Sequence, residues 1–353
     1  MHSDVNHPVS PVEQFISQIV EPQRNEMHLW KSTMKHQGIL LEDAQKRRRI
    51  TPTKMGPSFL LVHRGRTIGG IDSRTTTLVS GQARDATQSV EISHQYLQAS
   101  GISTTTGRSF HVSQLDAAEK YREQSGARVT ARPASERAKP VTSLAVSSAI
   151  ELQREWERSA EAVSHLKSVS QLVQVESYTQ DLALRVFVVG EEAVAAVLRV
   201  PFYLVGDGSS TVSQLLEAER TRRAACDYLG SRILPTQDED LALMKLTMDE
   251  ILTAGDIRIL ESAPEAAAGG GLSVDVFEEL SDELKDLAID AMWAFPGLTG
   301  TGVDIATPSL HSADGATVSN VVPTADIGEF LYPAYGEPRR CGVRIIDQML
   351  HGR

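Results

Sequence analysis

Two apolar runs joined by a short turn form the clearest pattern in the chain. Residues 184–189 and 194–200 consist largely of valine, leucine and alanine, and Gly190 begins the polar turn between them. Short apolar runs bounded by turn residues are typical of β-strands, so the segment is predicted to be a hairpin. A polar, glycine-rich loop follows at residues 206–210, and the Thr211 hydroxyl is expected to cap the next helix by accepting unpaired backbone N–H groups.

Helical and strand-like patterns alternate along the rest of the chain. Apolar positions spaced as on one helix face predict helices at residues 11–19, 26–34, 89–101, 116–125, 147–166, 213–227, 238–247, 281–295 and 342–350. Short apolar runs predict strands at residues 59–63, 127–133, 172–178, 257–260, 302–305 and 317–323. This mixture predicts an α/β (α+β) protein, and 353 residues are enough for two or three subdomains.

Composition and charge narrow the classes of function. The chain is 41% hydrophobic and 23% charged, as in ordinary globular proteins, and its net charge is −11. This charge argues against a broad nucleic-acid surface, so an anionic nucleotide needs a locally positive site. The spacing of Cys226 and Cys341 fits neither a zinc site nor a disulfide framework. No apolar run reaches the ~20 residues of a membrane-spanning helix and the N-terminus lacks a secretory pattern, so we expect a cytoplasmic protein with no membrane partner.

Four ordered motifs in the second half of the chain carry a family resemblance. They are residues 205–211 (VGDGSST), 270–275 (GGLSVD), 302–305 (GVDI) and 332–339 (YPAYGEPR). Together with the segments around them, they resemble the ATP-grasp superfamily, in the branch of glutathione and cyanophycin synthetases. The resemblance implies the ATP-grasp fold, in which two α/β subdomains grip a nucleotide cleft. It also implies a ligase that uses ATP and Mg²⁺ to join a carboxylate to an amine through an acyl phosphate.

The same resemblance implies a division of the chain and a set of partners. Residues 1–88 correspond to an N-terminal pre-grasp segment, residues 89–180 to the small subdomain of the grasp, and residues 181–353 to its C-terminal subdomain. The implied partners are a small-molecule carboxylate and an amine. Because members are often oligomeric, the resemblance also suggests a homodimer.

One strand matches the family's adenine-binding hinge. Residues 172–178 (LVQVESY) resemble it, which implies that backbone groups of Val175 and Glu176 contact adenine and that Tyr178 ends the hinge. An ordinary β-strand is the alternative interpretation of the same pattern.

Positive charge for the phosphates is implied at one strand end and the loop that follows. Arg132, directly before Pro133, stands where the family has a phosphate-binding lysine, and Lys139 lies in the next loop. A strand-end arginine in a surface ion pair is an equally good interpretation of Arg132. The ribose acid of the family aligns with Ala183, so Asp181 is the substitute that the sequence offers.

The metal and substrate positions are only partly kept. The resemblance places Asp304 and Asn320 as magnesium ligands, and Arg199 or Arg339 as a clamp for an acidic substrate, with Arg132 as the third catalytic candidate. Residues of other types occupy positions where the family has functional groups, at Val90, Ala183, Glu261 and Val322.

Three interpretations of function therefore stand side by side. The first is a diverged ATP-dependent carboxylate–amine ligase for amino-acid-like substrates, with secondary-metabolite biosynthesis as a natural setting. The second is a grasp-fold protein that does not use ATP for ligation, either a partner protein or a repurposed cleft. The third is an unrelated α/β protein that binds a sugar or nucleotide.

Overall fold

The computed structural model describes residues 9–139, 141, 143–230, 234, 241–242, 244–260 and 271–352. Its strands are β1 (Thr51–Met55), β2 (Ser58–His63), β3 (Arg66–Asp72), β4 (Thr75–Thr76), β5 (Gly107–His111), β6 (Val129–Pro133), β7 (Ala145–Val146), β8 (Leu172–Ser177), β9 (Leu182–Val189), β10 (Glu192–Val200), β11 (Tyr203–Val205), β12 (Ile257–Ile259), β13 (Leu272–Asp275), β14 (Gly300–Thr307) and β15 (Thr317–Val322). Its helices are α1 (Pro11–Phe15), η1 (Ile16–Val20), η2 (Glu21–Glu26), α2 (His36–Glu42), η3 (Asp43–Arg47), α3 (Gly81–Thr87), α4 (Val90–Ala99), α5 (Leu115–Ser125), α6 (Ala149–Val163), η4 (Ser168–Ser170), α7 (Val212–Ala224), α8 (Asp227–Gly230), α10 (Asp282–Trp293), α11 (Gly328–Leu331) and α12 (Cys341–His351).

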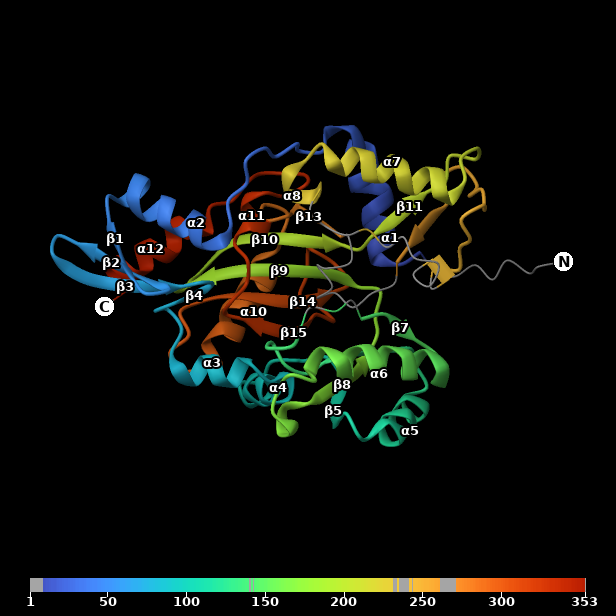
Figure 1. Cartoon of the computed structure of the whole chain (residues 1–353), viewed down its shortest axis with the longest axis horizontal. Coiled ribbons are helices and arrows are strands. Elements are labelled where there is room, and N and C mark those ends of the chain that lie inside the picture. The colour runs from blue at the N-terminus through green and yellow to red at the C-terminus, as the bar shows by residue number, and fades with distance from the viewer. Residues whose placement is uncertain are drawn as a thin grey trace.

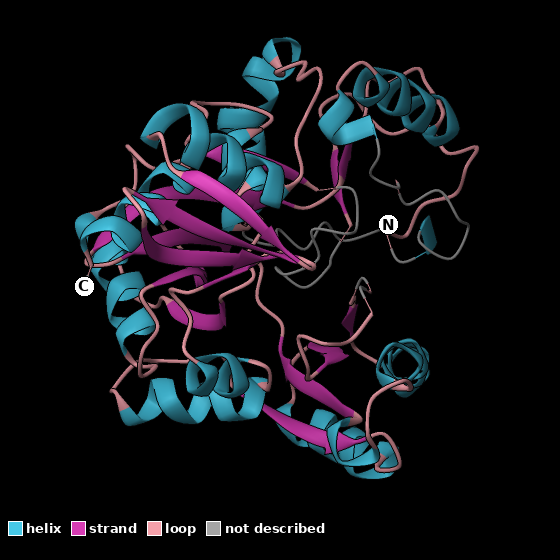
Figure 2. Ribbon diagram, turned by 60° about the vertical axis from the view of Figure 1, so that its left-hand side comes forward, coloured by secondary structure: helices cyan, strands magenta, loops and turns pink. Residues whose placement is uncertain are grey.

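An antiparallel sheet with the order β13-β10-β9-β14-β15 forms the centre of the molecule (Figure 1). The predicted hairpin is confirmed as β9 and β10, with Glu192 opposite Val189 at the turn. A second sheet, β5-β8-β6-β7, lies with α5 and α6 in a separate lobe beyond β15 (Figure 2). A third sheet, β1-β2-β3-β4, lies at the opposite end with α2 and α12 (Figure 1).

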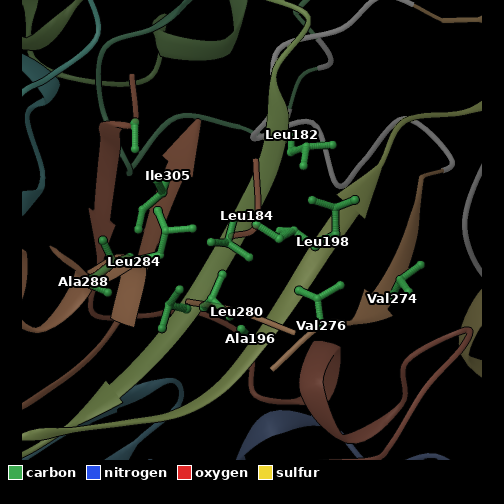
Figure 3. Close-up of a cluster of buried hydrophobic side chains, with 14 of the residues drawn as sticks. Leu182, Leu184, Ala196, Leu198, Val274, Val276, Leu280, Leu284, Ala288 and Ile305 are labelled. Carbon is green, nitrogen blue, oxygen red and sulfur yellow. The ribbon is translucent and has the colours of Figure 1, made fainter. Parts of the chain in front are cut away.

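One face of the central sheet is apolar along its whole length. Leu184, Ala196, Leu198 and Ile305 project from three strands into a cluster that includes Leu284 of α10 (Figure 3). The Ser281 hydroxyl caps this helix by accepting the N–H of Leu284, as a serine at that position predicts. Residues of α1 and η1 join the same cluster, so the N-terminal segment packs on this face.

The opposite face of the central sheet is divided into two ends. At one end Phe187, Val189 and Val197 pack against α12 and the β1–β4 sheet in a second apolar cluster. At the other end the same two strands present Arg185 and Arg199, and β14 presents Asp304; all three are largely buried charges. Because side chains alternate along a strand, the charged and apolar residues share one face of one sheet.

Alternation also divides the small sheet. Val129, Ala131, Val173 and Val175 pack in one core with Leu152 and Trp156 of α6. The residues between them are polar, so the opposite face of β6 and β8 presents Thr130, Arg132, Gln174 and Glu176, all of them buried.

The structure corrects one predicted helix. Residues 26–34 are not helical beyond Glu26, because Met27 has an extended ψ of 130° and Ser32 a positive φ of 59°. The Trp30 indole N–H instead donates to the carbonyl of Pro333 at 2.7 Å. The apolar residues of this segment are therefore fixed by distant packing and not by a helix face.

Other differences concern elements that the sequence patterns did not predict or that cannot be compared. Strands β1, β3 and β5 and helices α2 and α11 were not predicted, and β1 is largely exposed, so it lacks the apolar alternation that marks a strand. Of the predicted helix at 238–247, the described residues 241–242 are helical and residues 244–247 are not, with a positive φ of 57° at Lys245. Glu261 lies outside the described residues. Among the described residues, no helix has the length and apolar character needed to cross a bilayer.

Candidate functional site

Four charged side chains meet at the polar end of the central sheet. Arg185 of β9 donates two hydrogen bonds to Asp304 of β14, both at 2.5 Å. Arg199 of β10 donates two to Glu329 of α11, at 2.6 and 2.8 Å. Cross contacts of 3.5 Å join Arg185 to Glu329 and Arg199 to Asp304. We call these four residues the charge cluster.

Strand register brings the charge cluster together. Arg185 lies directly opposite Asp304 on β14, and it lies diagonally from Arg199, because Val197 is its partner on β10. Gly302 lies beside the arginine stem and leaves room for Ala325, since a Cβ at position 302 would lie only 2.6 Å from the Cβ of Ala325. The side chains are at most 10% exposed, so their pairing offsets a desolvation cost that isolated charges could not bear.

The predicted metal ligands are adjacent, but each has a protein partner. Asp304 and Asn320 face each other across β14 and β15. The Asn320 side-chain N–H donates to Glu136 at 2.6 Å, and Glu136 lies in the loop after β6. This hydrogen bond joins the small lobe to the central sheet. The sequence patterns did not predict this contact between Asn320 and Glu136.

The predicted phosphate residue Arg132 is paired with a residue of the predicted hinge. Its Nε donates to Glu176 at 2.6 Å, and the Thr105 hydroxyl donates to the same carboxylate at 3.1 Å. The two side chains are 8% and 5% exposed. The ion pair offered as the alternative for Arg132 therefore exists, although it is buried and does not lie on the surface.

The hinge prediction needs a correction. Strand β8 is paired on both sides, with β5 and with β6, over Val175 and Glu176. The backbone N–H of Tyr178 donates to the carbonyl of Arg128 at 3.0 Å. Adenine contacts through the backbone of Val175 or Glu176 do not fit this pairing, because those groups lie inside a three-strand ladder. The nearest backbone groups outside this ladder belong to the residues after Tyr178.

The remaining predicted residues do not join the charge cluster. Arg339 is bound to Asp275 at 2.6 Å and to Glu278 at 3.1 Å. Lys139 is exposed, and Asp181 is half-buried directly before β9. Three of the altered positions, Val90, Ala183 and Val322, are buried apolar side chains, which offer no ligand atom.

Sequence patterns missed three residues of this region. Arg185 is a charge inside an eight-residue strand that is buried throughout, and such an interruption of an apolar run is a usable signal. Glu329 lies in a four-residue helix that gave no signal. His94 of α4 is buried, its Nε2 lies 3.2 Å from the carbonyl of Ser319, and burial lowers the pKa of its imidazole. This contact between α4 and β15 adds to the one between Glu136 and Asn320 of β15.

Magnesium does not fit the donor set as it stands. Mg²⁺ takes near-octahedral oxygen ligands at about 2.0–2.1 Å, which needs accessible carboxylate oxygens. Both oxygens of Asp304 accept hydrogen bonds from Arg185, and Asn320, whose side-chain N–H donates to Glu136, has only a neutral carbonyl oxygen to offer. Within the described part of the chain, no group of three or more His, Cys, Asp or Glu side chains could hold a metal ion.

Comparisons with known proteins agree with this fold. No protein-family model matches the chain. A glutathione biosynthesis bifunctional protein from Mannheimia succiniciproducens is 31% identical over 191 residues, which are 50% of this chain and 24% of that protein. A cyanophycin synthetase from a Nostoc species is 29% identical over 206 residues, 56% of this chain and 22% of that protein.

The structural comparison covers more of the chain. A bifunctional glutathione synthetase from Pasteurella multocida has a TM-score of 0.58 and 19% identity, over 95% of this chain and 47% of that one. The chain spans about a quarter of the length of the curated relatives that it matches. The chain thus has the ATP-grasp fold, and about half of it is similar in sequence to glutathione and cyanophycin synthetases.

Proposed function

We propose that the protein is a diverged ATP-dependent ligase that joins the carboxylate of one small, amino-acid-like substrate to the amine of another. The observation that carries this proposal is the convergence of buried charge where the two lobes meet. Arg132 and Glu176 form a buried pair in the small lobe, the charge cluster lies in the central sheet, and the hydrogen bond from Asn320 to Glu136 joins the two lobes. Interiors keep buried charge at a cost, which points to use in binding or catalysis.

The proposed reaction has two balanced steps. A carboxylate oxygen of the first substrate attacks the terminal phosphorus of ATP, and ADP leaves with the electrons of the broken P–O bond. The amine of the second substrate then attacks the carbonyl carbon of the acyl phosphate, loses a proton, and releases inorganic phosphate. Phosphoryl transfer depends mainly on positioning and on neutralising charge, so cationic side chains are the groups required of the protein.

In this proposal the small lobe, residues 89–180, binds the nucleotide and the C-terminal part, residues 181–353, binds the substrates. Residues 1–88 are the pre-grasp segment, of which the described part, from residue 9, packs on the C-terminal part. Arg132 contacts phosphate oxygens after exchanging its partner Glu176, and Lys139 adds charge from the exposed loop. Asp181, which is half-buried directly before β9, binds the ribose in this proposal. Arg199 is the candidate for the substrate carboxylate, whereas Arg339 shares no partner with the charge cluster.

A second function is favoured by a specific observation. Arg132, Arg185 and Arg199 each form a short ion pair with a protein carboxylate, so the region is close to electrically neutral. A neutral cleft attracts a triphosphate weakly. This pairing favours a grasp-fold protein that binds a small molecule or a partner protein without using ATP for ligation.

An ADP-release assay with pairs of amino acids tests the proposed ligase. We expect ADP, phosphate and amide product in equal amounts, and only when a carboxylate and an amine substrate are both present. ADP formation without an amine indicates hydrolysis and leaves the amide-forming step unsupported. No ADP release with any pair, together with no heat of nucleotide binding for folded protein, rejects the ligase in favour of the second function.

A further inference from the structure

The charge cluster stands at the position where the resemblance places a metal. We propose that Arg185 and Arg199 take the place of a divalent cation as the counter-charge of Asp304 and Glu329, so that this part of the cleft binds no Mg²⁺ of its own. The inference goes beyond the proposed ligase, because it concerns the metal alone and holds whether or not ADP is released.

Hydrogen-bond geometry is the first argument. Every carboxylate oxygen of Asp304 and Glu329 accepts a hydrogen bond of 2.8 Å or less from a guanidinium N–H. Two bidentate pairs of this kind are the arrangement in which guanidinium and carboxylate groups match best. A metal ion could bind these oxygens only directly beside the two guanidinium groups that already hydrogen-bond to them, or by displacing one of those groups.

Electrostatics is the second argument. A dication bound to Asp304 or Glu329 would lie within a few ångströms of two guanidinium groups, each positively charged. Water screens this repulsion poorly, because the four side chains are only 5–10% exposed. The cluster already has two positive and two negative groups, so it gains no neutralisation from a further cation.

The described surroundings supply few other ligands. Within the described residues, no group of three or more His, Cys, Asp or Glu side chains could hold a metal ion. Asn320, the second predicted ligand, could offer only its neutral carbonyl oxygen, and Val322 belongs to an apolar core cluster. Metal sites need several oxygen donors that converge on one point. Magnesium that enters the cleft must therefore arrive on the phosphates of a nucleotide and be held by them.

Metal titration of the full chain without nucleotide tests the proposal. The probe is Mn²⁺, followed by its electron paramagnetic resonance signal and by the thermal midpoint of the protein with and without EDTA. Wild-type protein is expected to leave the Mn²⁺ signal free at millimolar concentrations and to melt at the same temperature with EDTA. The proposal is overturned if the wild-type protein binds Mn²⁺ with a dissociation constant below about 1 mM and Asp304→Asn loses this binding.

A gain-of-binding variant sharpens the test. Arg185→Met together with Arg199→Met removes both guanidinium groups and leaves Asp304 and Glu329 without counter-charge. If the arginines occupy the place of the cation, this variant binds Mn²⁺ at least tenfold more tightly than wild type and is stabilised by it. Arg339→Met is the matched control. It also removes an arginine that is paired with two carboxylates, those of Asp275 and Glu278, but this pairing lies outside the charge cluster.

The variant has two informative outcomes. A folded double variant that gains no Mn²⁺ affinity contradicts the proposal, because removal of the two arginines then does not create a cation site. A double variant that folds only when Mn²⁺ is present supports it. Should the variant not fold under any condition, the wild-type titration with Asp304→Asn decides alone. Because no nucleotide is present, these outcomes are separate from failure of the ligase assay.

Discussion

The two ends of one sheet face use the same strands for different purposes. At one end Phe187 and Val197 pack under α12, as an ordinary core does. At the other end Arg185 and Arg199, two residues away on the same strands, hold Asp304 and Glu329. Well-packed apolar residues stabilise such a position as well as a buried ion cluster does, and often better. The charged end is therefore explained better by function than by stability.

The largest expected effect comes from breaking the charge cluster. Asp304→Ala leaves Arg185 buried without its bidentate partner, so we expect the free energy of unfolding to fall by about 3–5 kcal/mol. Urea unfolding measures it. The control Asp282→Ala, whose carboxylate is 95% exposed, should change the value by less than about 0.5 kcal/mol. A loss below about 1 kcal/mol for Asp304→Ala would show that the cluster is open to water.

Acid should weaken the apolar end through a buried histidine. The Nδ1 of His36 accepts the N–H of Ile327 at 3.2 Å, and burial lowers the pKa of the imidazole to about 4. The unfolded chain, with a pKa near 6.5, therefore binds more protons than the folded one in this range, so stability is full above pH 6.5 and falls as the pH drops toward 4. We expect a loss of about 2 kcal/mol between pH 7 and pH 5.

His36→Asn tests this pH dependence, because asparagine keeps an acceptor but does not titrate. Urea unfolding at pH 7 and pH 5 should show a smaller difference for the variant than for wild type. Burial also lowers the pKa of the His94 imidazole, so acid should lower the free energy of unfolding through His94 as well. His94→Asn is therefore the second variant to compare. An unchanged difference in both variants would assign the acid sensitivity to other groups.

A conservative change in the apolar end should have a smaller effect. Ile346 of α12 is fully buried in the cluster that contains Phe187. Ile346→Val removes one methylene group and should lower the free energy of unfolding by about 1 kcal/mol. Ligand binding should be unchanged, since the residue lies at the apolar end. A change in affinity for any ligand without a change in stability would mean that the two ends are coupled.

The smallest expected effect is at the contact between the lobes. Glu136→Ala removes the acceptor of the Asn320 amide, and Glu136 is itself exposed, so the free energy of unfolding should fall by less than about 1 kcal/mol. Arg137→Ala, at the exposed neighbouring position, is the control and should be close to neutral. Equal losses in the two variants would show that the contact adds nothing measurable.

Local patterns were enough to predict much of the fold. The β9–β10 hairpin and the capped helices α6 and α10 follow from apolar runs, turn residues and serine caps that lie close together in sequence. Residues 26–34 show the limit, because Trp30 is fixed by a hydrogen bond to Pro333, which is 303 positions away. No local pattern carries that information.

The residues of the site were easier to predict from the sequence than the contacts between them. Resemblance pointed to Arg132, Glu176, Asp304 and Asn320. In the structure Arg132 pairs with Glu176, and Asn320, opposite Asp304 in the central sheet, contacts the small lobe through Glu136. The resemblance did not show that Arg132 pairs with Glu176, or that Arg185, 119 positions away, binds Asp304. These partners are set by strand order, which residue types alone do not reveal.

The most direct test of the proposed nucleotide cleft is a calorimetric titration with ATP. The wild-type protein is compared with Arg132→Met/Glu176→Gln, which removes both charges of the buried pair and leaves neither unpaired. Arg108→Met, an exposed position on β5 of the same sheet, is the control. We expect wild type and Arg108→Met to bind ATP alike and the double variant to bind ATP at least tenfold more weakly. Equal affinity in all three proteins, or no binding by the folded wild type, would contradict this expectation.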